Sequence, residues 1–118
     1  MAATKTAKTL LTSQSLAAGA SVNITEWNMT TAYGGVLFVK LTNGASAPTT
    51  APVVTFYSGE TTGTKRTEYT VTGDTVNSSI NHPSCRYELS HMFANATITN
   101  GATNAITVEC FGQEATTI

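Results

Sequence analysis

The run from Ala32 to Gly44 constrains the fold of this chain more than any other segment. It is the only long apolar run, and turn-forming Gly-Gly and Asn-Gly pairs lie at its two ends. The residues between them have the length and composition of a β-strand. The two faces of this strand differ: Leu37, Val39 and Leu41 alternate on one, and Val36, Phe38, Lys40 and Thr42 on the other. Such a strand is expected at the middle of a packed sheet, with its half-apolar face against another layer or another subunit.

Shorter and more polar strands are predicted around this run. Segments of alternating apolar and polar residues recur at a spacing of roughly 8–14 residues, and no segment keeps a helical period. The clearest pair is Phe93–Thr99 and Ala105–Phe111, joined by a loop of turn residues. Thr64–Thr72 alternates as well, with Tyr69 and Val71 expected inward. The pattern predicts an all-β fold, a single-domain jelly roll or β-sandwich of eight or nine short antiparallel strands.

The sequence divides into one domain with two short ends. Its 118 residues suit a single domain with its own core. Residues 1–7 are small, polar and aperiodic, and they are predicted to form a flexible N-terminal arm. Residues 8–112 are predicted to form the β-sandwich, and residues 113–118 a polar C-terminal tail. Either end could add a strand to a neighbouring molecule.

The charge pattern argues against two classes of partner. Charged residues make up 11% of the chain and the formal net charge is −1, so there is no basic surface for a nucleic acid or an anionic membrane. No apolar run approaches the roughly 20 residues that span a bilayer. The residues behind Lys5 and Lys8 lack the apolar core of a signal peptide. We expect a chain that is made in a cytoplasm or exported by other means.

The inventory of chemically active residues is thin. His82, Cys85 and His91, with Cys110 elsewhere, are the densest set of N and S ligands, but they lack the second spaced pair of a zinc site. We favour ordinary loop and core roles for them, and we expect no metal and no cofactor. The two cysteines could form one bridge, although buried thiols are favoured. A Cys–His nucleophile pair would lack an orienting third group.

Carboxylates give no better indication of catalysis. The six glutamates are scattered along the chain, and the only aspartate, Asp74, lies beside Gly73 in a predicted turn. A pair of catalytic carboxylates needs two groups held close together in different environments, and no spacing here indicates that arrangement. We expect no enzymatic activity.

Three aromatic residues, Trp27, Tyr33 and Tyr57, are candidates for a sugar-stacking platform. The alternative, which we favour for the tyrosines, is that their rings pack beside core strands with the hydroxyls at the surface. Trp27 falls on the polar face of the alternating segment Ser21–Trp27. It is either a residue at the rim of the sheet or a sign that the strand has already bent.

Several short sequence segments of the chain resemble small structural proteins of tailed-phage virions. The likeness extends over about two thirds of the sequence, and the segments that carry it lie at residues 16–20, 31–49, 96–101 and 105–108. The resemblance implies a jelly-roll or sandwich domain that decorates or cements a capsid shell, or that sits in the tail. Such proteins act through protein–protein contacts, so the resemblance implies no catalytic motif.

These observations together predict a virion structural protein on the outer capsid surface, made in the host cytoplasm. Its expected partners are the major capsid protein and itself, as a trimer or dimer. The residues expected at oligomer or capsid contacts are Val36, Phe38, Trp27 and Tyr33. The alternative is a carbohydrate-binding module, or a head or tail appendage that contacts host glycans.

Overall fold

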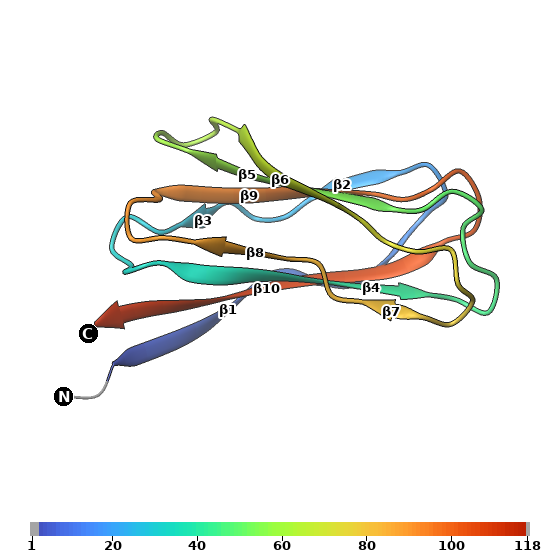
Figure 1. The fold of residues 1–118 in the computed structure, drawn as a ribbon, viewed down its shortest axis with the longest axis horizontal. Helices are drawn as coiled ribbons and strands as arrows, with labels where there is room; N and C mark the ends of the chain where they lie inside the picture. The colour runs from blue at the N-terminus through green and yellow to red at the C-terminus, as the bar shows by residue number, and fades with distance from the viewer. Residues whose placement is uncertain (1–2, 118) are drawn as a thin grey trace.

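The computed structural model describes residues 3–117, and these residues form an all-β sandwich (Figure 1). Two antiparallel sheets of five strands pack face to face. Sheet A has the order β1-β10-β4-β7, with β8 also paired to β4; sheet B has the order β2-β9-β5-β6, with β3 also paired to β9. The strands are β1 (Thr4–Leu16), β2 (Ser21–Asn23), β3 (Trp27–Asn28), β4 (Gly35–Asn43), β5 (Val53–Gly59), β6 (Arg66–Thr72), β7 (Ile80–Asn81), β8 (Ser84–Tyr87), β9 (Phe93–Thr99) and β10 (Ile106–Thr117).

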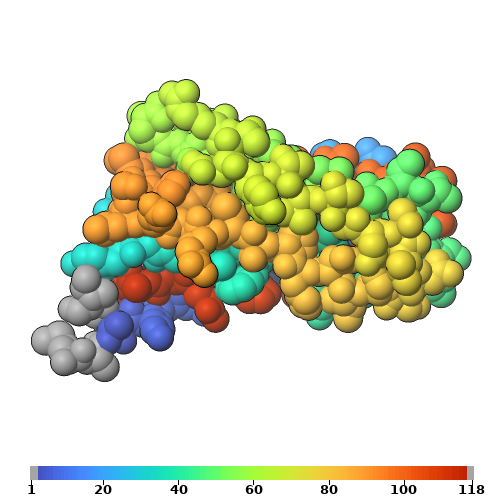
Figure 2. Space-filling view, viewed as in Figure 1, coloured from blue at the N-terminus to red at the C-terminus, as the bar shows by residue number. Residues whose placement is uncertain are grey.

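This architecture confirms the predicted fold class. The described residues form ten strands rather than eight or nine, because several predicted strands are split or shortened. The molecule is elongated, with extents of 48, 29 and 19 Å (Figure 2). Among the described residues no helix is long and apolar enough to span a membrane.

The apolar run forms β4, the strand at the middle of sheet A, as predicted. It pairs with β10 along one edge and with β8 and β7 along the other. Leu37, Val39 and Leu41 are fully buried and face sheet B. Opposite them, sheet B contributes an equally closed inner face from β5 and β9: Val54, Phe56, Ala94, Ala96 and Ile98. Alternation along each strand therefore places the core between the two sheets.

The two chain ends differ from the flexible arm and tail that we expected. β1 begins at Thr4 and pairs with the end of β10, with Thr4 opposite Thr117 and Lys5 opposite Ala115. Both segments lack an apolar pattern, yet pairing satisfies the backbone N–H and C=O groups that they direct toward each other. Residues 1, 2 and 118 of the expected arm and tail lie outside the described residues.

The segment Ser21–Trp27 is not one strand. It divides into β2 and β3, both paired to β9, and the bend between them turns Trp27 into the core. Tyr69 was expected inward, and its pairing opposite the buried Phe56 places it on the inner face of sheet B, but 56% of it is exposed. Since β6 is an edge strand of sheet B, its side chains have strand neighbours on one side only.

A turn shaped by Asp74 lies between β6 and β7. Asp74 Oδ1 accepts hydrogen bonds from the backbone N–H of Val76 at 3.0 Å and from Ser79 Oγ at 2.7 Å. These bonds hold the pKa of the Asp74 carboxyl below its usual value. The aspartate therefore has a structural role in shaping the turn before β7.

Candidate contact face on sheet A

The outer face of sheet A carries an aromatic pair at its centre. Phe38 of β4 and Phe111 of β10 lie opposite each other in register. Their rings stack with centroids 5.4 Å apart and planes at 27°. Phe111 is 37% exposed, and Phe38 and the neighbouring Val36 are half-buried. We call Val36, Phe38 and Phe111 the contact face, because these apolar side chains point away from the core.

A charged pair borders the contact face on one side. In the next outward row, Lys40 of β4 lies opposite Glu109 of β10, with Lys40 Nζ 3.7 Å from Glu109 Oε1. About a third of each side chain is exposed, so the pair forms a solvated rim. An apolar centre with a polar rim is the usual anatomy of a protein–protein interface.

The outer face of sheet B has a different chemistry. Its side chains are mostly small and polar, and many of them pair with one another. Thr97 Oγ1 donates to Asn23 Oδ1 at 2.6 Å, and the hydroxyls of Ser21 and Thr99 lie 2.8 Å apart. A face whose polar groups already have partners offers less to a second protein than the aromatic face of sheet A.

Trp27 does not lie on the contact face, which corrects its expected role as a contact residue. Its side chain is 1% exposed and packs beneath β4 and β10. Gly35 and Gly112 leave the room for it, because a Cβ on either glycine would lie within 3.0 Å of the indole ring. The tryptophan therefore supports the sheet from below, and no ligand can stack on it in this conformation.

A buried carboxylate holds the indole in place. Trp27 Nε1 donates to Glu114 Oε2 at 3.1 Å, and Lys8 Nζ lies 2.9 Å from Glu114 Oε1. Glu114 is 6% exposed, so both contacts compensate for the cost of burying its charge. The Tyr87 ring packs against the indole in a T-shaped arrangement, with centroids 6.4 Å apart and planes at 75°.

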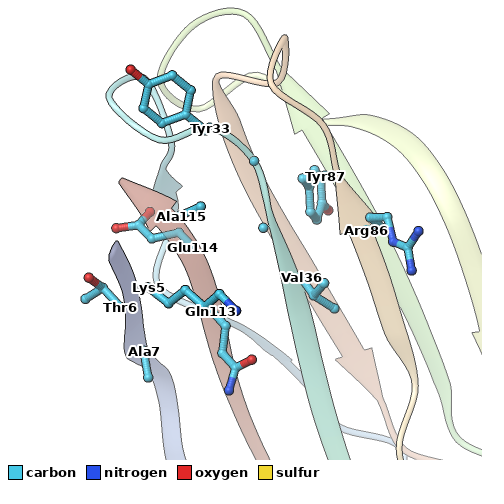
Figure 3. A pocket seen from close by; sticks show the side chains of 12 residues that line it. Lys5, Thr6, Ala7, Tyr33, Val36, Arg86, Tyr87, Gln113, Glu114 and Ala115 are labelled. Carbon is cyan, nitrogen blue, oxygen red and sulfur yellow. The ribbon is translucent and has the colours of Figure 1, made fainter. Parts of the chain in front are cut away.

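A hollow of about 550 Å³ lies next to the contact face, at the end of the sheet where the first residues of β1 pair with the last residues of β10 (Figure 3). Polar side chains from four segments line it: Lys5, Tyr33, Arg86 and Gln113. Val36 also lines it, so the hollow and the contact face are continuous. Tyr33 is 45% exposed, in agreement with a surface position for this predicted contact residue.

The two cysteines are free thiols. Cys85 pairs with Leu37 and Cys110 with Val39, so β4 separates their strands by two strand spacings. That is about 10 Å, beyond the span of a disulfide. Burial raises the pKa of Cys110 to about 12 and also raises the pKa of Cys85. Raised thiol pKa values are the opposite of what a nucleophile needs.

The histidines are not brought together with the cysteines as a metal site. Within residues 3–117 no group of three or more His, Cys, Asp or Glu side chains has the geometry to hold a metal ion. His91 Nδ1 accepts a hydrogen bond from the backbone N–H of Glu88 at 2.8 Å, and its ring packs edge-on against Tyr87. His82 is exposed in the loop before β8.

Sequence reasoning missed Phe111, Lys5 and Arg86 on the outer face. A signal for Phe111 was present, because the alternation that places Val108 and Cys110 inward places Phe111 outward. No comparable signal existed for Lys5 and Arg86. Their positions depend on the pairing of β1 with β10 and of β8 with β4, which no local pattern reveals.

No protein-family profile and no curated protein sequence matches this chain. Solved structures do match. A chain from "Bacillus endospore appendages form a novel family of disulfide-linked pili" superposes with a TM-score of 0.57 at 18% identity, over 100% of this chain and 93% of its own.

Two further matches cover less of their own chains. The K3 cleaved adhesin domain of Lys-gingipain from Porphyromonas gingivalis gives a TM-score of 0.55 at 10% identity, over 80% of this chain and 63% of that one. A chain of infectious bursal disease virus, Gt strain, gives 0.53 at 9% identity, over 93% and 32%. At these identities the likeness establishes the β-sandwich fold, a fold that these appendage, adhesin and virus structures share.

Proposed function

We propose that this protein is a non-enzymatic structural subunit that decorates or cements the outer surface of a tailed-phage capsid. The observation that carries the proposal is the stacked Phe38–Phe111 pair on the open face of sheet A. The sequence resembles small phage virion proteins, and this resemblance indicates a capsid as the assembly in which such a face would be used. The partner is the major capsid protein, and the subunit itself is a dimer or trimer seated on a symmetry axis.

The size of the contact face suits repeated, modest contacts. Full burial of one apolar side chain contributes about 1.5–3 kcal/mol, and these rings are already partly covered by their neighbours. One such face cannot by itself offset the cost of association between two proteins. Several copies of the face on one oligomer would bind together, and avidity would then supply the affinity that one face lacks.

One observation favours a second candidate, a subunit of a surface appendage. The endospore pilus chain is matched over all of this chain and 93% of its own length, so the whole domain has its counterpart in a fibre subunit. The glycan-binding alternative loses its main candidate, because Trp27 is buried. It also loses one face of Tyr57, because Lys65 Nζ lies 5.7 Å from the centroid of that ring.

Copy number in purified particles of the source separates these functions. Quantitative mass spectrometry against the shell protein should find hundreds of copies per particle, in a simple ratio to the shell. A handful of copies, in multiples that match a vertex or tail, would favour the appendage. Absence from particles would refute both capsid decoration and a vertex or tail appendage of the virion.

A variant pair tests the contact face directly. Phe38→Ser with Phe111→Ser should abolish rebinding to particles from which the protein has been removed. Tyr69→Ser is the matched control, since Tyr69 is an exposed aromatic residue of sheet B and should be dispensable. Thermal unfolding of each variant establishes that the fold survives. Undiminished binding of the folded double variant would exclude the contact face as the capsid-binding surface.

A further inference from the structure

The hollow beside the contact face holds polar side chains that have no partner among residues 3–117. In the described residues, no hydrogen bond or ion pair engages the side chains of Lys5, Arg86, Gln113 or the Tyr33 hydroxyl. The other four cations are all engaged: three form ion pairs, and Lys65 lies over the Tyr57 ring. The two unpaired cations of this part of the chain thus line the same hollow.

The one carboxylate among the described residues that line the hollow is already paired. Glu114 lines the hollow, but its oxygens are occupied by Lys8 and by the indole N–H of Trp27. The next carboxylate on the face, Glu109, is paired with Lys40. The described residues that line the hollow therefore carry two positive charges with no paired carboxylate, although the chain as a whole carries a formal charge of −1.

The strand register fixes where the two cations stand. Arg86 lies opposite Val36, which lies opposite Gln113, which lies opposite Ala7; Lys5 is two residues from Ala7 along β1. The backbones of Lys5 and Arg86 are thus three strand spacings apart, about 14 Å across the strands, with a further offset of about 7 Å along them. In Figure 3 the Lys5 side chain extends from β1 across β10, while Arg86 lies beyond Val36. Two long cationic side chains border a floor made of Val36, Ala115 and Gln113.

Between β10 and the segment that enters β4, the backbone around the hollow is already paired, and the unpaired edges of sheet A lie on the outer sides of β1 and β8. Tyr33 N–H donates to the Ala115 carbonyl at 2.7 Å, and Ala115 N–H donates to the Gly34 carbonyl at 3.2 Å. A bound segment would therefore be recognised by side chains, and the two cations would select its charge. The volume of the hollow suits a few residues of a peptide.

We propose that this hollow receives an acidic peptide segment of the shell partner, with its carboxylates paired to Lys5 and Arg86. The inference rests on the proposed function, from which it takes the contact face as the docking surface and the shell protein as the partner. The aromatic pair would supply apolar burial at the centre, and the cations would fix the orientation of the partner at one end. The shell partner is thereby identified by chemistry: an apolar patch beside a run of Asp, Glu or a chain terminus.

Amide chemical-shift mapping by NMR on the whole chain tests the charge recognition without any particle. The probes are acetylated tetraglutamate amide and its isosteric control, acetylated tetraglutamine amide. Tetraglutamate should give saturable shifts confined to the hollow at millimolar concentration in low salt, weaker at physiological ionic strength. Tetraglutamine should give none. Lys5→Gln with Arg86→Gln should weaken tetraglutamate binding at least about tenfold, and the control Lys65→Gln should leave it unchanged.

Three outcomes would overturn the inference: no saturable shift at the hollow, equal shifts from both peptides, or unchanged tetraglutamate binding by the double variant. D-glucuronate serves as a further probe, with D-glucose as its neutral control. Tighter binding of glucuronate than of tetraglutamate would assign the hollow to an acidic sugar instead. Because none of these titrations involves a capsid, their failure is separate from failure of the particle-binding tests.

Discussion

Gly112→Ala is expected to destabilise the fold because of the indole beneath it. A Cβ at this position would lie 2.8, 2.9 and 3.0 Å from three carbons of the Trp27 ring. The ring has little freedom to move away, because it is 1% exposed, hydrogen-bonded to Glu114 and packed against Tyr87. The contact must be relieved by a shift of the indole or of β10.

Two opposing terms set the magnitude. Replacing a strand glycine by alanine gains about 0.4–1 kcal/mol through the unfolded chain. Overpacking a closed core costs about 1–3 kcal/mol. The net expectation is a loss of about 1–2 kcal/mol, which corresponds to a fall in Tm of about 4–8 °C for a domain of this size.

Urea and thermal unfolding, followed by the fluorescence of the single tryptophan, measure the effect. Gly44→Ala is the matched control, since a Cβ at Gly44 would meet no heavy atom within 4 Å, and this variant should stay within about 0.5 kcal/mol of wild type. In a Trp27→Phe background the cost of Gly112→Ala should largely disappear. A Gly112→Ala protein as stable as wild type, or more so, would refute the reasoning.

Three further predictions follow from buried groups. Glu114→Ala should lower the free energy of unfolding by about 1–3 kcal/mol, because it leaves the buried indole N–H without an acceptor. Glu114→Gln keeps an acceptor and should lower it less. Chemical denaturation of both variants measures the difference. Stability should fall as pH rises above about 9, because the unfolded Cys110 thiol then loses its proton, while burial holds its folded pKa near 12. A Cys110→Val variant should show a weaker fall over that window, and an identical pH profile would contradict the assignment. Trp27 fluorescence should resist quenching by acrylamide and stay flat on titration with sugars, since the ring is buried; ready quenching would place it at the surface.

The sequence was informative where burial followed a local pattern. The alternation in β4 predicted both the buried Leu37–Leu41 row and the half-apolar outer face, because one strand at the middle of a sheet sees a different environment on each side. The alternation also predicted the inward residues of the hairpin from Phe93 to Phe111. It places Phe111 on the outer face as well, although that residue was not predicted as a contact residue.

The errors arose where pairing overrode local pattern. Trp27 lay on the polar face of its segment, but a bend after β2 and two distant glycines, Gly35 and Gly112, created an inward site for it. The β1 and β10 ends have no apolar period, yet they form a ladder because each supplies the other's backbone partners. The hollow could not be foreseen at all, since its residues come from four separate parts of the chain.

The pairing of β1 with β10 also has a mechanical consequence. Thr4 and Thr117 are partners, so the chain enters and leaves the sandwich at the same pole (Figure 1). A pulling force applied to both ends would load this ladder at its terminal rung and peel β1 from β10 one hydrogen bond at a time. A force applied between one end and the outer face of sheet A would instead act along the strands, where many hydrogen bonds share the load. A subunit anchored through that face is therefore held in its stronger direction when a single end is pulled.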